Sequence, residues 1–168
     1  MEISRKIAPE TNITIPQMFK TRPYEDKIDF DKLRLYRLDR VREELEKKNI
    51  GACLLFDPIN IRYATDSRNM SIFCTHNLHR YCFVPVNGPI ILYEFFKCNH
   101  INSHLKLIDE IRPSIIWDYF GSGDQADHQV IKWGNEIHNL VKQYCGKEKR
   151  LAVDVCNSEG FFALKKFH

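Results

Sequence analysis

Five consecutive apolar residues, Ala52–Phe56, constrain the fold more than any other feature of this sequence. A strand that is apolar at every position, and not only at alternate ones, is covered on both of its faces. Apolar residues recur at three- and four-residue steps in the segment before it, as in an amphipathic helix: Leu35, Leu38, Val41 and Leu45. The pair Asp57-Pro58 after it joins an N-cap residue to a proline at the first helical position, which is a helix-start signal. The sequence therefore predicts a buried strand between two helices.

The rest of the chain continues to alternate between short strands and helices. We predict further strands at residues 70–74, 80–85, 89–93, 114–119 and 151–155. We predict helices at residues 59–63, around 101–108, at 124–144, and from Asn157 or Ser158 onward. Asn87-Gly88, between two apolar runs, is the strongest hairpin signal. This pattern indicates an α/β fold, a three-layer α/β/α arrangement with a mixed sheet of about six strands.

Two regions of the chain differ in composition. Residues 1–30 are polar, contain Pro9, Pro16 and Pro23 and show no sustained periodicity, so we predict an extended N-terminal arm. Residues 31–168 carry the helix and strand patterns and form the predicted domain. The last segment resembles a strand followed by a helix that has barely begun. We therefore expect the chain to be the front part of a longer protein.

Bulk composition argues against several classes of function. The chain is 43% apolar and has a net charge of +3, with its basic residues spread out. Nucleic-acid binding needs a clustered basic stripe, so we predict no nucleic-acid partner. No segment approaches the roughly 18 apolar residues that a membrane span needs, and the N-terminus lacks the apolar core of a signal peptide. We expect a cytoplasmic protein with no membrane partner.

The reactive side chains form no convincing catalytic or metal-binding set. The six cysteines include no CxxC pair, and most lie in apolar runs, where cysteine behaves as a small hydrophobic residue. His100 and His104 have the spacing of two zinc ligands but lack an acidic residue between them and a third ligand. Cys74 and His76 could form a thiol–imidazole pair, although a buried structural cysteine is the better interpretation. We predict no catalytic residue and no metal ligand in this chain.

One irregular segment is open to two interpretations. Residues 60–77, after the first strand, bring arginines, amide side chains, an aromatic ring and a histidine together within a short stretch. Ligands in α/β domains are held at such strand-end loops. The segment is equally compatible with a polar loop whose side chains make scattered hydrogen bonds.

Three motifs in order carry a resemblance to a known family. They are Arg37–Leu45, Gly51–Phe56 and Asn60–Thr65. In this order they resemble the amino-terminal domain of the creatinase/prolidase/aminopeptidase P family, and the likeness extends over residues 31–168. Asp66 stands where that family usually has a glycine.

Within that family, the amino-acid sequence most resembles the branch that includes dimethylsulfoniopropionate lyases. Four segments carry this likeness: Asn69–Asn77, Glu94-Phe95, Asp109–Pro113 and Trp117–Phe120. Phe73 occupies a position where a tryptophan is expected in that branch. Proline-specific dipeptidase and creatinase-type amidinohydrolase activities remain open alternatives.

The resemblance implies a non-catalytic domain that shapes a substrate pocket and a dimer interface. It implies a carboxy-terminal pita-bread catalytic domain beyond residue 168, which would hold two divalent metal ions (Mn, Fe, Co or Zn) and act on a small zwitterionic or peptide-like substrate. A second subunit would complete a homodimer, and this chain alone would be inactive. The resemblance suggests four substrate contacts: Arg62, Arg68, Phe73 and His76. The alternative is a stand-alone binding or adaptor module with the same fold.

Overall fold

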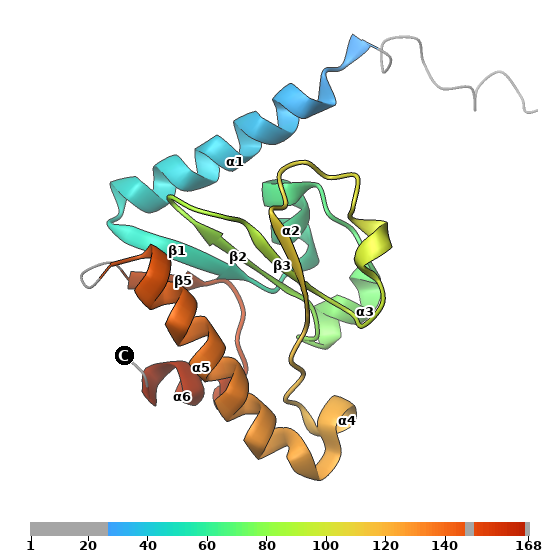
Figure 1. The fold of residues 1–168 in the computed structure, drawn as a ribbon, viewed down its shortest axis with the longest axis vertical. Coiled ribbons are helices and arrows are strands. Elements are labelled where there is room, and N and C mark those ends of the chain that lie inside the picture. The colour runs from blue at the N-terminus through green and yellow to red at the C-terminus, as the bar shows by residue number, and fades with distance from the viewer. Residues whose placement is uncertain (1–26, 147–149, 167–168) are drawn as a thin grey trace, which may run out of the picture. The chain divides into compact units, whose positions relative to one another are not determined.

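The computed structural model describes residues 27–146 and 150–166, so most of the predicted arm, residues 1–26, lies outside the described residues. Within these residues, five strands are interspersed with helices (Figure 1). The strands are β1 (Ile50–Leu55), β2 (Tyr81–Pro85), β3 (Ile91–Glu94), β4 (Glu110–Pro113) and β5 (Arg150–Val153). The α-helices are α1 (Phe30–Lys47), α2 (Pro58–Thr65), α3 (Ser71–His76), α4 (Tyr119–Ser122), α5 (Ala126–Tyr144) and α6 (Ser158–Lys166). Single 3-10 turns lie at η3 (Asn99–Ile101) and η4 (Gly123–Gln125).

The sheet is mixed, as predicted, with the strand order β4-β3-β2-β1-β5. β2 pairs antiparallel with β1 and with β3, whereas β5 pairs parallel with β1 and β4 pairs parallel with β3. Four strands therefore run in one direction and only β2 runs in the other. As a result, the carboxyl ends of β1, β3, β4 and β5 meet the amino end of β2 at one edge of the sheet, which we call the carboxyl edge.

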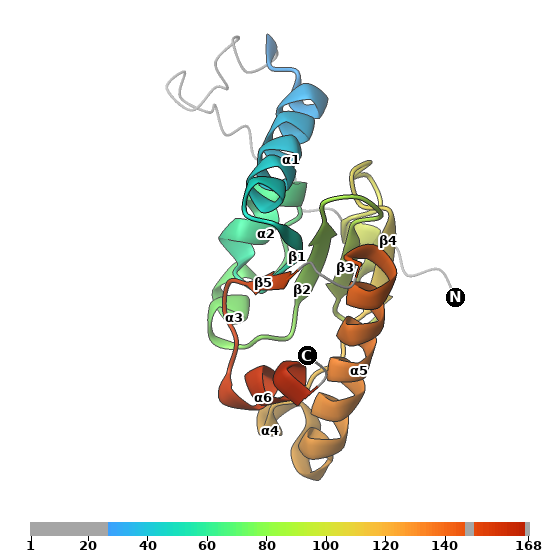
Figure 2. The ribbon, with the colours of Figure 1, turned by 90° about the vertical axis from the view of Figure 1, so that its left-hand side faces the viewer.

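Helices cover both faces of the sheet, which confirms the three-layer prediction (Figure 2). On one face, Leu38 of α1 and Ile61 of α2 pack with Cys53 and Leu55 of β1. On the other face, the alternate residues Leu54 and Phe56 pack with residues of α5 and α6. The all-apolar run Ala52–Phe56 is thus buried from both sides. The two tryptophans belong to this second core, and the ring centroids of Trp117 and Trp133 lie 4.2 Å apart.

The local signals around α2 and α6 act as predicted. The Asp57 carboxylate caps α2, accepting hydrogen bonds from the amides of Ile59 at 2.7 Å and Asn60 at 3.1 Å. Asn157 caps α6 by accepting from the Gly160 amide at 3.0 Å. Asp66 ends α2 in a left-handed conformation, with φ 63°. That conformation favours glycine, although Asp and Asn tolerate it, which explains why an aspartate can replace the usual glycine here.

Three predicted elements were wrong. Residues 70–74 form most of α3 and not a strand, because the amides of Cys74 and Asn77 bond to carbonyls four residues back. The predicted strand at 114–119 is irregular, and β4 lies just before it. The predicted helix around 101–108 is reduced to the η3 turn. Short apolar runs do not distinguish strand from helix by periodicity alone. In the part of the chain that the structure describes, the sheet has five strands where about six were predicted.

Candidate functional site

Several segments that are distant in sequence meet at the carboxyl edge of the sheet. They are the loop of residues 66–70, α3, the His79-Arg80 pair before β2, the Glu94-Phe95 pair at the end of β3, and α4 with the preceding Asp118. In α/β sheets this is the edge at which loops gather ligand-binding side chains, since the carboxyl ends of like-directed strands open there.

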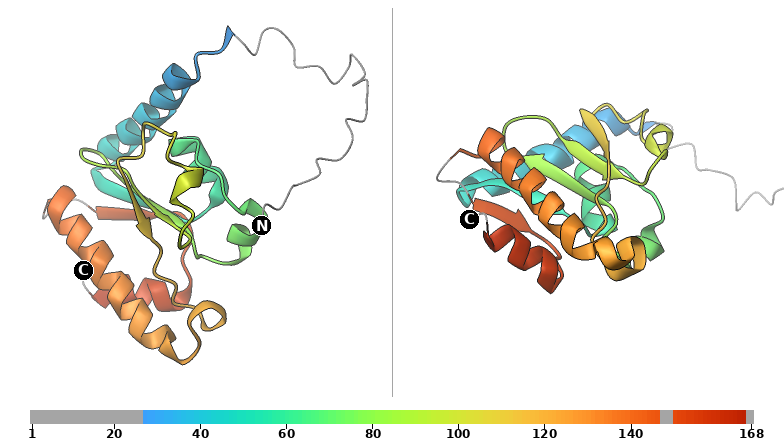
Figure 3. Two further views of the ribbon diagram at one scale, coloured as in Figure 1. Left: turned by 45° about the vertical axis from the view of Figure 1, so that its right-hand side comes forward. Right: turned by 60° about the horizontal axis from the view of Figure 1, so that its bottom comes forward.

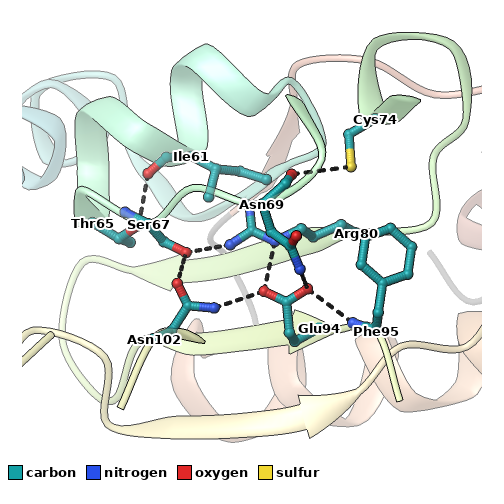
Figure 4. A network of polar contacts seen from close by, with 9 residues as sticks. All are labelled: Ile61, Thr65, Ser67, Asn69, Cys74, Arg80, Glu94, Phe95 and Asn102. Atoms are coloured by element: carbon teal, nitrogen blue, oxygen red, sulfur yellow. Dashed lines mark hydrogen bonds and ion pairs between the residues drawn. The ribbon is translucent and has the colours of Figure 1, made fainter. Parts of the chain in front are cut away.

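A fully buried ion pair joins β2 to β3 at this edge (Figure 4). Nε of Arg80 lies 2.8 Å from Oε2 of Glu94, and both side chains are 0% exposed. The carboxylate accepts three further hydrogen bonds, from Asn102 Nδ2 at 2.7 Å, Asn69 Nδ2 at 2.9 Å and the Phe95 amide at 2.9 Å. A buried charge is tolerated when it is paired and its remaining hydrogen-bonding capacity is used, and Glu94 meets both conditions.

The same network fixes the loop of residues 66–70. Ser67 Oγ accepts from Arg80 Nη2 and donates to Asn102 Oδ1 at 2.5 Å. The Ser67 amide donates to Thr65 Oγ1 at 3.1 Å, and Thr65 Oγ1 donates to the Ile61 carbonyl at 2.7 Å. Ser67 and Asn69 are therefore held by hydrogen bonds to the buried network, while Arg68 between them is exposed. The arrangement presents one arginine on a rigidly held loop.

An aromatic cluster lies beside this network and is centred on Phe73 of α3. Its ring centroid is 5.3 Å from that of His79, 6.1 Å from Phe95 and 6.5 Å from Phe120. The imidazole of His79 is buried, pairs with the Asp118 carboxylate and stacks under Phe120. Asp118 also caps α4 by accepting from the Gly121 amide at 2.7 Å. Aromatic faces arranged in this way can attract a cationic group.

Two shallow hollows flank α3. The first, about 540 Å³, is lined by residues 70–73 with His76 and Asn77. The second, about 280 Å³, is lined by residues 75–78, Trp117, Asp118 and residues 155–157. His76 and Asn77 line both hollows and thus form the ridge between them.

The structure brings two of the four predicted contact residues together, whereas neither of the two predicted arginines lines either hollow. Phe73 and His76 share α3 and line the first hollow. Arg68 is exposed on the anchored loop that leads into α3. Arg62 is exposed on α2 and lines neither hollow.

The buried pair Arg80–Glu94 was missed by sequence reasoning, although the signal was present. A basic and an acidic residue stand next to two otherwise apolar runs on either side of the predicted hairpin. The hairpin pairs Tyr81 with Tyr93, so the next pair outward is Arg80 with Glu94. Register counting from Asn87-Gly88 would have found it. His79, Asp118 and Phe120 gave no comparable signal, because they come from the loop before β2 and from the start of the short helix α4, which only the tertiary fold brings together.

The thiol–imidazole pair suggested by residues 74 and 76 does not form. Because the segment is a helix, the two side chains point in different directions, with Cys74 buried and His76 exposed. Burial raises the pKa of the Cys74 thiol, and it also raises the pKa of Cys156 to about 11 and that of Cys53 to about 12. Nucleophilic cysteines need the opposite shift.

Within residues 27–146 and 150–166, no group of three or more His, Cys, Asp or Glu side chains is placed to hold a metal ion. His100 lies in the η3 turn and His104 beyond it, so the two do not share a helix. None of the helices in this described part of the chain is long and apolar enough to cross a membrane.

Comparison with known proteins agrees with this fold. The dimethylsulfoniopropionate lyase DddP of Roseovarius nubinhibens is 32% identical over 137 residues, which cover 82% of this chain and 31% of the lyase. The lyase DddP of Roseobacter denitrificans is 31% identical over 140 residues, 83% of this chain and 31% of the lyase. The chain thus spans about a third of the length of these curated relatives.

Solved structures resemble the chain in fold. A proline dipeptidase of Streptococcus pneumoniae superposes with a TM-score of 0.51 at 16% identity, over 78% of this chain and 84% of that one. The creatinase/prolidase N-terminal domain of an X-Pro dipeptidase of Streptococcus pyogenes gives a TM-score of 0.50 at 14% identity, over 79% and 87%. A family model for the creatinase/prolidase N-terminal domain matches residues 37–165. The chain therefore belongs to the creatinase/prolidase N-terminal domain family.

Proposed function

We propose that this chain is the non-catalytic, pocket-shaping and dimer-forming domain of a cytoplasmic metal-dependent enzyme, in the manner of the dimethylsulfoniopropionate lyases it resembles. The observation that carries the proposal is the construction of the carboxyl edge. A deeply buried ion pair there anchors an exposed arginine, beside an aromatic cluster that opens onto a hollow. Such a surface can recognise a small molecule.

The chemistry of this edge suits a small zwitterion. The guanidinium of Arg68 can pair with a carboxylate through two parallel hydrogen bonds. The faces of Phe73 and Phe120 can hold a sulfonium or quaternary ammonium group by cation–π attraction. Dimethylsulfoniopropionate, the compound in the names of the two lyase relatives, carries both a carboxylate and a sulfonium group. The side chains of this edge therefore suit that compound. An Xaa-Pro dipeptide, which also carries both charges, is the second candidate substrate, and the dipeptidase structures share this fold.

In this proposal, the catalytic domain and its metal lie outside this chain. A carboxy-terminal catalytic domain would hold the divalent metal, and we assign no step of metal chemistry to residues 27–166. A large part of the apolar surface formed by α3 and α4 is open to solvent: Phe120 is 79% and Ile72 85% exposed. Exposed apolar patches of this kind mark surfaces that another protein surface covers. We propose that the catalytic domain and a second subunit cover it.

A chimeric enzyme tests this function. Residues 31–168 replace the corresponding segment of the Roseovarius lyase, and release of dimethyl sulfide is measured. We expect turnover by the chimera and none by the isolated chain, with or without Mn, Fe, Co or Zn. Phe73→Ala in the chimera should raise KM about tenfold, because the loss of a desolvated cation–π contact is worth roughly 1–2 kcal/mol. Ile59→Ser, at an exposed site on α2, is the control.

Two outcomes would contradict the proposal. Turnover by residues 1–168 alone that survives a chelator would show that this chain contains the reacting groups. A folded, dimeric chimera that binds neither dimethylsulfoniopropionate nor an Xaa-Pro dipeptide would favour a stand-alone binding module.

A further inference from the structure

A buried histidine contacts both of the phenylalanine rings that could hold a cationic group. The side chain of His79 is only 4% exposed. Its ring centroid lies 5.3 Å from that of Phe73, which it meets edge-on, and 6.3 Å from that of Phe120, to which it is nearly parallel at 20°. The centroids of Phe73 and Phe120 are 6.5 Å apart, so the two rings pack on one imidazole. The position of His79 therefore sets the position of both rings.

The imidazole is paired with Asp118, which also fixes the helix that carries Phe120. Nε2 of His79 pairs with Oδ2 of Asp118, and Oδ1 of Asp118 accepts a hydrogen bond from the Gly121 amide at 2.7 Å. The short helix α4 leads through the η4 turn into α5 (Figure 3). A Cβ at residue 121 would overlap Ile116 and lie 3.2 Å from Cε1 of His79, so the backbone of α4 lies directly against the imidazole.

Two carboxylates at this edge differ in what neutralises them. Glu94 is fully buried and its charge is offset by the guanidinium of Arg80. The side chain of Asp118 is 32% exposed, and its partner is an imidazole, which carries no charge in its neutral form. With a neutral imidazole, the pair of His79 and Asp118 has one net negative charge. This charge lies beside an apolar aromatic surface, which screens it less than bulk water does.

We propose that Asp118 is the counter-charge for the cationic group of the substrate, and that His79 is a positioning residue that holds Asp118 and Phe120 in place. The inference rests on the proposed function, which assigns the aromatic cluster to substrate recognition. A methylated sulfonium or ammonium group has no hydrogen to donate, so ring faces and a nearby negative charge are what can hold it. Both oxygens of Asp118 are already engaged, which keeps the carboxylate beside the rings.

The pair also makes cation binding depend on pH. Histidine commonly gains its proton between about pH 8 and 5. A proton on His79 cancels the net charge of the pair, so cation binding should weaken as the pH falls. Arg80 and Glu94 neutralise each other, and His76 is a second imidazole on α3. Besides Asp118, the titratable or charged side chains on the segments around His79 include Cys74, His76, Arg80, Glu94, Lys97 and Tyr119.

Binding of tetramethylammonium to the purified chain tests the counter-charge without any enzyme activity. The cation is titrated at constant ionic strength, and the ring-proton resonances of Phe73 and Phe120 are followed by NMR. We expect saturable shifts of both rings. Asp118→Asn keeps an acceptor oxygen for the cap but removes the charge, so it should weaken binding roughly five- to tenfold. The matched control is Asp127→Asn, which removes the same charge from an exposed aspartate of α5 and should change binding less than about twofold.

An uncharged probe separates charge from shape. tert-Butanol has three methyl groups and a size similar to tetramethylammonium, but no charge. It should bind the unsubstituted chain and Asp118→Asn equally, because only the charge differs between them. Asp118→Ala, which also removes the acceptor for the Gly121 amide, should weaken the binding of both probes, because Phe120 loses its fixed position.

Substitution of the imidazole tests the role of His79. The dissociation constant of tetramethylammonium should be about fivefold higher at pH 5 than at pH 8 in the unsubstituted chain. His79→Gln keeps a side-chain amide that can donate to Asp118 but does not titrate, so the ratio of the two constants should be close to one. His76→Gln removes the other imidazole of this edge and should keep the ratio of the unsubstituted chain.

Three results with the isolated chain would overturn the inference. They are the absence of a saturable shift of either ring in the folded chain, equal losses of binding in Asp118→Asn and Asp127→Asn, and a pH dependence that His76→Gln abolishes and His79→Gln retains. The chimera described above separates this inference from the proposed function. Asp118→Asn in the chimera should raise KM for dimethylsulfoniopropionate and leave kcat unchanged. An active chimera with an unchanged KM would contradict only the role of Asp118, whereas a folded chimera that binds neither candidate substrate would contradict the proposed function.

Discussion

At the scale of single residues, the pair Arg80–Glu94 dominates the candidate site. Glu94 accepts four hydrogen bonds and neutralises a guanidinium that is itself buried. Nη1 of Arg80 has no hydrogen-bond partner among the described residues, so the ion pair with Glu94 is the principal compensation for its burial. The loop that presents Arg68 depends on this pair, because Ser67 and Asn69 each contact one of its members.

Glu94→Gln should therefore be strongly destabilising. The change is nearly isosteric but leaves a buried, uncompensated guanidinium, and breaking a buried pair costs roughly 3–5 kcal/mol of unfolding free energy. The matched control is Glu110→Gln, which breaks the exposed ion pair with Arg112 and should cost about 1 kcal/mol or less. Urea denaturation followed by circular dichroism measures both. Equal losses in the two variants would contradict a special role for the buried pair.

Cys156 gives the chain a pH dependence in the alkaline range. Burial raises the pKa of its thiol from 9.0 to about 11. Above pH 9 the unfolded chain releases this proton while the folded chain keeps it, so the unfolding free energy falls as pH rises from 9 to 11. Below pH 9 the Cys156 thiol is protonated in both the folded and the unfolded chain, so its titration does not lower the unfolding free energy there. In Cys156→Ala this part of the decline should disappear, as denaturant titrations at pH 8, 9, 10 and 11 would show. If the unfolding free energy of Cys156→Ala fell between pH 9 and 11 as steeply as that of the unsubstituted chain, the prediction would be wrong.

At the scale of elements, sequence patterns identified those stabilised by local interactions. β1, α5 and the hairpin of β2 and β3 were predicted, because each carries its own periodicity or turn residues. α3 was not, since its only buried residue is Cys74 and its apolar residues do not repeat on one face. β4 was displaced by a few residues for a similar reason. Its position is set by pairing with β3, which no local pattern records.

The start of α2 is the clearest case of local control. The Asp57 carboxylate satisfies two amides of the first turn. Asp57→Ala leaves both without that acceptor and should lower the unfolding free energy by about 0.5–2 kcal/mol. Asp124→Ala, at an exposed aspartate in the η4 turn, is the matched control and should change stability by less than about 0.5 kcal/mol. Thermal unfolding of both variants checks the difference, and Asp57→Asn should restore most of the loss. Equal melting temperatures for the two alanine variants would argue against the cap.

At the scale of the whole molecule, the fold class followed from the sequence more completely than the site did. A strand that is apolar on both faces, such as Ala52–Phe56, requires two covering layers, and the alternation of strands with helices along the sequence indicated that these layers are helical. The site instead depends on which loops meet at the carboxyl edge. Phe73 was predicted as a contact residue, yet its partners Phe120 and His79 come from α4 and from the loop before β2, and only the sheet order brings these two segments together.

The exposed apolar surface around α3 provides a test at this scale. Ile72 is 85% exposed there and Ile59 is 73% exposed on α2, so Ile72→Ser and Ile59→Ser remove the same group from similarly open helix positions. Each should change the unfolding free energy by less than about 0.5 kcal/mol, because neither side chain is packed. If another surface covers α3, however, only Ile72→Ser should weaken association. In the chimera with the rest of the Roseovarius lyase, and for the dimer proposed above, analytical ultracentrifugation should show a higher dissociation constant in Ile72→Ser and an unchanged one in Ile59→Ser. Equal effects of the two substitutions would mean that the surface around α3 is not the one that subunits share.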